Sequence, residues 1–152
     1  MQFKKSLIIT VLGLSIVGFS TGASAANNDG LVDSEVTQSN KQADNTNLIS
    51  GRAAKPSNSS RIDVYKPLLG KTYAVAKSSS TVKEDYIYAK ARTFNGDGAL
   101  IKSNSTSAKK TTYTSVRADN GTIYSGNDWA IGNHTYKLKG YKDINHETKA
   151  YW

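Results

Sequence analysis

The sequence predicts an all-β fold, a small antiparallel β-sandwich or barrel of about six or seven short strands, preceded by a disordered N-terminal segment. Two observations carry this prediction. Short segments rich in Tyr, Thr, Val and Ile alternate with a period of two, and turn signals separate them. No segment of the domain shows a convincing apolar period of 3.6 residues. The chain also has no cysteine, which excludes disulfides, thiol catalysis and Cys-ligated zinc.

The first 25 residues have the features of a cleaved signal peptide. Lys4 and Lys5 precede an apolar run over residues 7–19, and Ala-Ser-Ala at 23–25 forms the small-x-small pattern of a cleavage site. No later apolar run is long enough to span a bilayer. We therefore expect a secreted, extracellular bacterial protein whose mature chain begins at Ala26 and has no transmembrane segment.

Residues 26–60 differ in composition from the rest of the mature chain. They contain no aromatic residue and are rich in Asn, Ser, Asp, Gln and Ala. A segment of this kind buries too little apolar surface to offset its conformational entropy, so we expect a disordered spacer or pro-segment. All nine tyrosines, both tryptophans and Phe94 follow residue 60. This distribution predicts one all-β domain over residues 61–152.

The strand pattern recurs along this domain, and turn signals mark two of its connections. Asn-Gly-Asp-Gly at 95–98 and Asp-Asn-Gly at 119–121 supply residues that tolerate positive φ, as tight hairpins require. The tail, residues 131–152, has the pattern of a closing hairpin like the last strands of immunoglobulin-like modules. We expect Tyr151 and Trp152 to dock on the core. The expected strands lie within 72–76, 85–94, 99–103, 112–118, 122–125, 134–141 and 148–152.

The positive charge belongs to the predicted domain. Residues 61–152 contain 15 Lys+Arg and 8 Asp+Glu, a net charge of +7, whereas residues 26–60 have a net charge of −1. If Ile87, Ile101 and Val116 point inward, alternation places a set of tyrosines and cations together on an outward face. This candidate binding set consists of Tyr86, Tyr88, Lys90, Arg92, Lys102, Tyr113 and Arg117.

A sheet face of tyrosines and cations indicates a binding function. Tyrosine offers a rigid stacking surface with a hydroxyl group, and cations attract anionic partners over a long range. The expected partner is an anionic cell-wall polymer such as teichoic acid, a glycan or a membrane surface, and no nucleic acid is expected. The alternative is an ordinary polar outer face of an antiparallel sheet, where Tyr, Lys and Arg are common.

Enzyme signals are weak, and we expect a non-enzymatic protein without catalytic residues, metal or cofactor. His134, His146, Asp143 and Glu147 contain the ligand types of a zinc site or of an acid–base pair, but they follow no known spacing. Exposed or hydrogen-bonded surface histidines are the favoured interpretation. A secreted ribonuclease is a third alternative, with Glu84, Arg92, Arg117 and the two histidines as candidate groups.

The tail "DWAIGNHTYKLKGYKDINHETKAYW" contains a Trp-Ala pair and ends in an aromatic residue followed by Trp. In these features it resembles the C-terminus of the lactococcin 972 type of bacteriocins, which are small, basic, cysteine-free β-sandwich proteins. The resemblance covers these 25 residues, and the spacer and the larger domain depart from the family. It implies a bacteriocin or toxin-like effector as the main alternative function.

Overall fold

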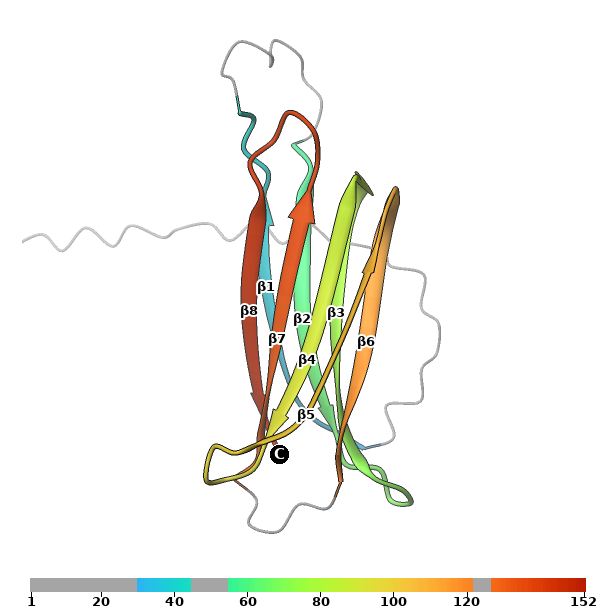
Figure 1. Ribbon diagram of the computed structural model, residues 1–152, viewed down its shortest axis with the longest axis vertical. Coiled ribbons are helices and arrows are strands. Elements are labelled where there is room, and N and C mark those ends of the chain that lie inside the picture. Colours follow the sequence, from blue (N-terminus) through green and yellow to red (C-terminus); the bar gives the residue numbers. More distant parts are fainter. Residues whose placement is uncertain (1–29, 45–54, 122–126) are drawn as a thin grey trace, which may run out of the picture.

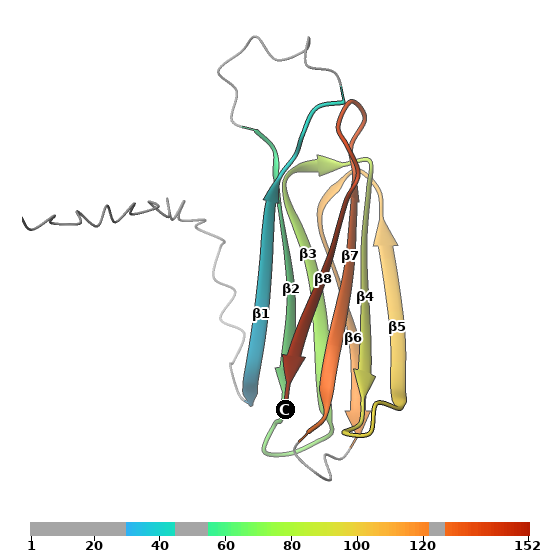
Figure 2. The ribbon, with the colours of Figure 1, turned by 90° about the vertical axis from the view of Figure 1, so that its left-hand side faces the viewer.

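The computed structural model describes residues 30–44, 55–121 and 127–152, and the predicted signal peptide lies outside these ranges. The described chain forms eight β-strands in two antiparallel sheets that pack face to face (Figures 1 and 2), which confirms the predicted fold class. A helix with the length and hydropathy of a membrane span is absent from these ranges. The strands are β1 (Leu31–Asn40), β2 (Ser57–Tyr65), β3 (Thr72–Glu84), β4 (Tyr86–Phe94), β5 (Leu100–Ala108), β6 (Thr111–Gly121), β7 (Trp129–Lys137) and β8 (Ile144–Tyr151).

The order of strands within the sheets differs from their order in the sequence. The first sheet has the order β1-β2-β3-β6, and the second has the order β5-β4-β7-β8. The chain therefore crosses between the sheets after β3, after β5 and after β6. The predicted closing hairpin is confirmed, because β7 and β8 pair from Trp129↔Tyr151 to Tyr136↔Ile144.

The predicted spacer is wrong for residues 31–40 and 57–60. Residues 31–40 form β1, which pairs with β2 from Leu31↔Tyr65 to Asn40↔Ser57, so β2 also begins before the expected boundary. The strand was missed because its side chains bury little apolar surface. Its inward side chains are polar, and Asp33 and Glu35 accept hydrogen bonds from the backbone N–H groups of Tyr151 and Lys149 on β8. Residues 26–29 and 45–54 lie outside the described ranges.

The two turn predictions have different outcomes. The β4–β5 hairpin turns at 95–98 as expected, with Gly98 at φ 88° and its N–H donating to Asn95 O over 2.9 Å. At the second predicted turn, Gly121 has the expected positive φ, at 75°. The tight hairpin is wrong, because residues 119–121 end β6, where Asp119 pairs with Tyr73 and Gly121 with Thr72. The expected strand at 122–125 lies outside the described residues.

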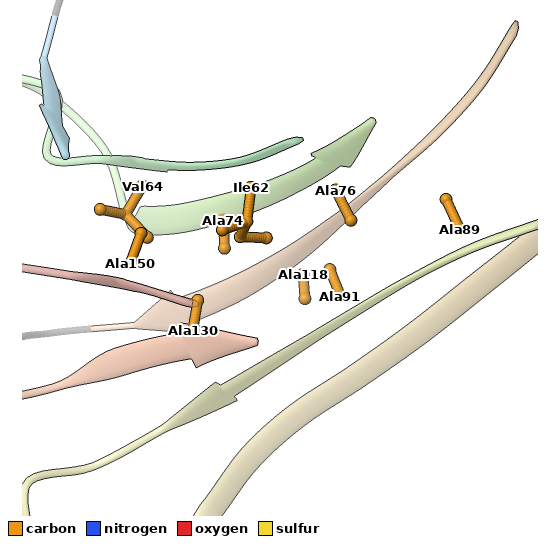
Figure 3. Close-up of a cluster of buried hydrophobic side chains, with 9 residues drawn as sticks. All are labelled: Ile62, Val64, Ala74, Ala76, Ala89, Ala91, Ala118, Ala130 and Ala150. Atoms are coloured by element: carbon orange, nitrogen blue, oxygen red, sulfur yellow. The ribbon is translucent and has the colours of Figure 1, made fainter. Parts of the chain in front are cut away.

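The apolar core is built mainly from small side chains. Its central cluster of nine buried residues contains Ile62, Val64 and seven alanines contributed by both sheets (Figure 3). Val116 and Trp152 pack against it from the margin. Because alanine buries little apolar area, this cluster contributes only part of the stability. The rest of the buried interior contains Ile87, Tyr136 and many polar side chains, most of them hydrogen-bonded.

The chain terminus docks as expected for one of its two aromatic residues. The Trp152 indole Nε1 donates to Tyr65 O over 3.0 Å, and its backbone N–H donates to Asp128 O over 3.1 Å. The prediction is wrong for Tyr151, which points outward and is 51% exposed. Alternation explains the difference, because Ala150 and Trp152 face the core while Tyr151 faces the other side.

Candidate binding surface

Strand β4 presents four members of the candidate binding set on one outward face. Tyr86, Tyr88, Lys90 and Arg92 point away from the core, because Ile87 and the other alternate residues are fully buried. The Tyr86 and Tyr88 rings stack with centroids 6.5 Å apart. The period-two assignment of this strand is therefore confirmed.

Tyr113 and Arg117 also point outward, but on the other sheet. They lie on β6, which pairs with β3, so their outward side chains emerge on the opposite side of the sandwich from those of β4. The alternation predicted for residues 112–118 is confirmed, since Thr114 and Ala118 are buried. The expectation that all outward residues share one face is wrong, because β6 does not join the sheet of β4.

Lys102 occupies a different face from the one predicted. A bulge between β4 and β5 pairs Thr93 with Lys102 and Phe94 with Leu100. Directly opposed residues share a face, and the Thr93 side chain is buried, so Lys102 lies on the inner side of the sheet near its exposed edge. Ile101, which was expected inside, is 41% exposed. One inserted residue reverses the alternation and explains both errors.

Neighbouring strands add aromatic residues and a cation to the outward face of β4. Phe94 of β4 pairs with Trp129 of β7, which pairs with Tyr151 of β8. The Phe94 and Trp129 rings stack with centroids 5.5 Å apart. Lys149 Nζ lies 5.0 Å from the Trp129 ring centroid and 4.9 Å from that of Tyr151. We call this outward surface of β4, β7 and β8 the aromatic-cationic face; it contains Tyr86, Tyr88, Lys90, Arg92, Phe94, Trp129, Lys149 and Tyr151.

One hydrogen bond and one ion pair hold a cation of this face in position. Arg92 Nη2 donates to Asn133 Oδ1 over 2.8 Å and lies 3.6 Å from Glu147 Oε2. The Arg92 guanidinium also lies 5.7 Å from the Phe94 ring centroid. In the described part of the chain, Lys90 forms no ion pair. Glu147 pairs with Arg92 and leaves Lys90 unpaired among the described residues, so the face retains positive charge.

The outward face of the first sheet has a different charge arrangement. The buried carboxylate of Asp63 forms ion pairs with Arg61 and with Lys77, whose Nζ lies 2.8 Å away. Burial by itself would raise the pKa of Asp63, but hydrogen bonds from Lys77, Ser34 and Arg61 hold it below its ordinary value. Both cations are thus committed to an internal carboxylate, which makes this face less suited to an external anion.

The outer surface of the first sheet also contains a stack of side chains and a hollow. The Tyr65 and Tyr73 rings stack at 4.8 Å, and the Arg117 guanidinium lies 3.6 Å from the Tyr73 centroid. These three side chains therefore stack on one another. Nearby, a shallow hollow of about 360 Å³ lies between Val36, Arg61 and several serine side chains.

Both histidine rings face inward, but only His134 is fully buried, so its predicted surface position is wrong, whereas His146 is half-buried and hydrogen-bonded. His134 is 1% exposed, and its ring nitrogens bond Ser78 Oγ at 2.8 Å and Thr148 Oγ1 at 3.0 Å. His146 bonds Ser60 Oγ at 2.7 Å and Ser39 Oγ at 2.9 Å. Burial and the charge of His146 lower the pKa of His134 to about 4, and burial also lowers the pKa of His146.

The groups considered for metal binding or hydrolysis are not brought together. Asp143 pairs with Lys137 at 2.9 Å, and Glu147 lies beside Arg92 on the outer surface. No cluster of three or more His, Asp or Glu side chains suited to a metal ion occurs among the described residues. Glu84 is buried against Lys41, and Arg92 and Arg117 lie on opposite sheets.

The aromatic-cationic face is therefore the best candidate for a functional surface. It unites four of the seven predicted residues with Phe94 of the same strand and with three residues that the strand pairing adds. Phe94 was visible in the alternation of residues 85–94, whereas Trp129, Lys149 and Tyr151 required the register of β7 and β8. Comparison of the chain with protein-family models, curated proteins and solved structures finds no match.

Proposed function

We propose that this chain is an exported binding protein whose aromatic-cationic face binds an anionic cell-wall polymer or glycan. The observation that carries the proposal is the row of rings Phe94, Trp129 and Tyr151, set directly beside the cations Arg92 and Lys149. Export rests on the signal-peptide pattern of residues 1–25. The net charge of +7 in residues 61–152 would attract a polyanion at long range.

The spacing of the face suits an extended polymer. Adjacent strands lie about 4.8 Å apart, so Arg92 on β4 and Lys149 on β8 are separated by roughly 10 Å. Lys90 and Arg92 are two residues apart on one strand, a separation of about 7 Å. A chain with phosphate groups crossing the strands would thus meet several cations in succession. Flat aromatic faces favour sugar rings, and tyrosine hydroxyls add hydrogen bonds.

The hydrogen-bonded position of Arg92 reduces the entropy cost of binding. Its guanidinium already contacts Asn133 and Glu147, so it loses little side-chain freedom when an anion arrives. Lys90 is free of ion pairs within the described residues and does not have to leave a carboxylate partner. Together they provide one oriented cation and one adaptable cation.

Co-sedimentation with bacterial cell envelopes tests the proposal. The protein is mixed with envelopes that contain or lack teichoic acids, across a series of salt concentrations. We expect binding that requires the polyanion and falls steeply as salt increases. Binding that is equal with and without the polyanion, or insensitive to salt, would contradict the proposal.

A matched pair of variants assigns the binding to one face. Tyr88→Ser with Lys90→Gln should weaken binding about tenfold or more, because it removes a ring and a free cation. Tyr113→Ser with Lys109→Gln removes the same residue types, one from the outward face of β6 and one from the β5–β6 turn, and should bind as the wild type does. Equal effects of the two variants, with melting temperatures unchanged, would show that the aromatic-cationic face is not the site.

A further inference from the structure

Exposed apolar side chains gather at one end of the sandwich. Of the eight large hydrophobic side chains exposed in the described part of the chain, six lie at the end where β2 leads into β3, β4 leads into β5 and β8 terminates (Figures 1 and 2). The strand register places these positions at one end of each sheet. In the first sheet, Leu31 pairs with Tyr65. In the second sheet, Phe94 pairs with Leu100 and with Trp129, and Trp129 pairs with Tyr151. The six are Val32, Leu68, Leu69, Leu100, Ile101 and Tyr151.

The β2–β3 loop carries the most exposed of them. Leu68 is 99% exposed and Leu69 is 88% exposed. Two adjacent leucines with almost no intramolecular contact contribute nothing to the core, and their exposure to water is unfavourable. Their hydrophobic surface is available to an external apolar phase.

The loop is held at its base, so the leucines project from a defined position. The Lys66 N–H donates to Gly30 O over 2.6 Å. Gly30 has φ +91°, and a Cβ there would lie 2.6 Å from Lys66 O, so only glycine allows this close approach. Pro67 restricts the backbone just before the leucines, and Gly70 at φ +111° reverses the chain after them.

Two exposed lysines flank the leucines. Lys66 and Lys71 stand on either side of the loop tip, and neither forms an ion pair within the described residues. The opposite end of the sandwich has a different composition, with charged residues such as Lys110, Lys139 and Asp143 in its turns. An apolar tip between cations is complementary to a lipid surface, where acyl chains lie beneath anionic head groups.

We propose that this end of the sandwich docks on an anionic lipid bilayer, with Leu68 and Leu69 inserted among the acyl chains and Lys66 and Lys71 at the head groups. Stable membrane association requires two weak signals, and the loop supplies one apolar and one basic signal. Tyr151 belongs both to this end and to the aromatic-cationic face, so the two proposed surfaces adjoin there. Leu68 and Leu69 lie in the β2–β3 loop of the other sheet, whereas Tyr88 and Lys90 lie in the first half and the middle of β4. A docked sandwich would stand on the bilayer by its end and direct its sheet faces sideways.

Vesicle sedimentation tests the docking. The probe vesicles contain phosphatidylcholine alone or phosphatidylcholine with phosphatidylglycerol. The protein begins at Ala26, because the apolar run at residues 7–19 would bind lipid by itself, and every described strand lies after that point. We expect binding to the phosphatidylglycerol vesicles and much weaker binding to phosphatidylcholine alone. No binding to either vesicle, or equal binding to both, would overturn the proposal.

Matched variants separate the two signals. Leu68→Ser with Leu69→Ser should reduce binding on the order of 100-fold, whereas Val36→Ser, which removes an exposed aliphatic residue from the middle of β1, should have no effect. Lys66→Gln with Lys71→Gln should reduce binding about 30-fold, and Lys139→Gln with Lys142→Gln at the opposite end should not. Both loop variants should keep the wild-type melting temperature. Unchanged binding in either loop variant would overturn the assignment.

A single label reports insertion directly. Because the chain has no cysteine, Leu69→Cys creates one site for an environment-sensitive fluorophore, and Val36→Cys creates the control site. We expect a blue shift on phosphatidylglycerol vesicles for the label at 69 alone. A concentration-dependent dimer that dissociates in the Leu68→Ser, Leu69→Ser variant would instead identify the loop as an interface between two copies and overturn lipid docking. Two cross-tests distinguish lipid docking from polymer binding. The Leu68→Ser, Leu69→Ser variant should still bind the polymer, and the Tyr88→Ser, Lys90→Gln variant should still bind the vesicles.

Discussion

Lys41 Nζ lies 3.2 Å from Glu84 Oε2, and neither side chain is exposed to solvent. The contact is an ion pair without a hydrogen bond, since neither atom has a hydrogen-bond partner in the described part of the chain. The other carboxylate oxygen of Glu84 accepts hydrogen bonds from Asn58 at 2.8 Å and from Ser80 at 2.7 Å. The pair therefore joins the segment after β1 to the ends of β2 and β3.

Removal of one partner of this pair should destabilise the fold strongly. Lys41→Met leaves the buried Glu84 carboxylate uncompensated, so we expect a loss of about 3–5 kcal/mol in the free energy of unfolding, measured by urea denaturation. Adding Glu84→Gln to Lys41→Met should recover part of the loss, because it removes the unpaired charge. The exposed control Lys142→Met should differ little from the wild type. Equal stability of Lys41→Met and the control would contradict the importance of the pair.

The segment before residue 57 should be essential for stability, although its composition predicts a spacer. A chain that starts at Ser57 lacks β1 and the lysine of the buried pair. It also lacks the carboxylates of Asp33 and Glu35, which accept hydrogen bonds from backbone N–H groups of β8. We expect it to lose at least about 3 kcal/mol of unfolding free energy, a large share of the usual stability of a small domain. Thermal unfolding followed by circular dichroism measures the effect, and a melting temperature equal to that of the chain from Ala26 would show that β1 is dispensable.

Stability should fall when the pH decreases from 6.5 to about 4. Burial lowers the pKa of His134 from 6.5 to about 4, so the folded state favours the neutral ring. In that range the unfolded chain binds more protons than the folded chain, and stability is lost as the pH decreases. The full contribution is about 3 kcal/mol. Urea denaturation across this range should show a smaller pH dependence in His134→Asn than in the wild type; an equal dependence would assign the effect to other groups.

The last two residues should differ sharply in their effect on stability. Trp152 packs against the core and donates to Tyr65 O, so Trp152→Ala should cost about 2–3 kcal/mol of unfolding free energy. Tyr151 is 51% exposed on the aromatic-cationic face, so Tyr151→Ala should cost less than about 1 kcal/mol. Thermal or chemical unfolding of the two variants makes the comparison. Similar losses would mean that both aromatic residues stabilise the terminus.

Period-two alternation predicted side-chain orientation well wherever a strand is regular. The inward positions of Ile87 on β4 and Ala118 on β6 follow from the local pattern alone. The bulge after Thr93 is not visible in that pattern, because it depends on which residue of β5 meets Phe94. Lys102 was misplaced for this reason, and so was Ile101.

The all-β class, the β4–β5 turn, the closing hairpin and the outward residues of β4 could be predicted from the chain alone, because turn chemistry and alternation are local properties. The pairing of β6 with β3 and not with β4, which separates Arg117 from Arg92, is a property of the folded molecule. The same long-range pairing makes β1 a strand, because the mostly polar residues 33–39 are ordered by backbone pairing with β2 and by contacts with β8. Strand pairing joins residues far apart in the chain, and no short segment encodes which partner it will meet.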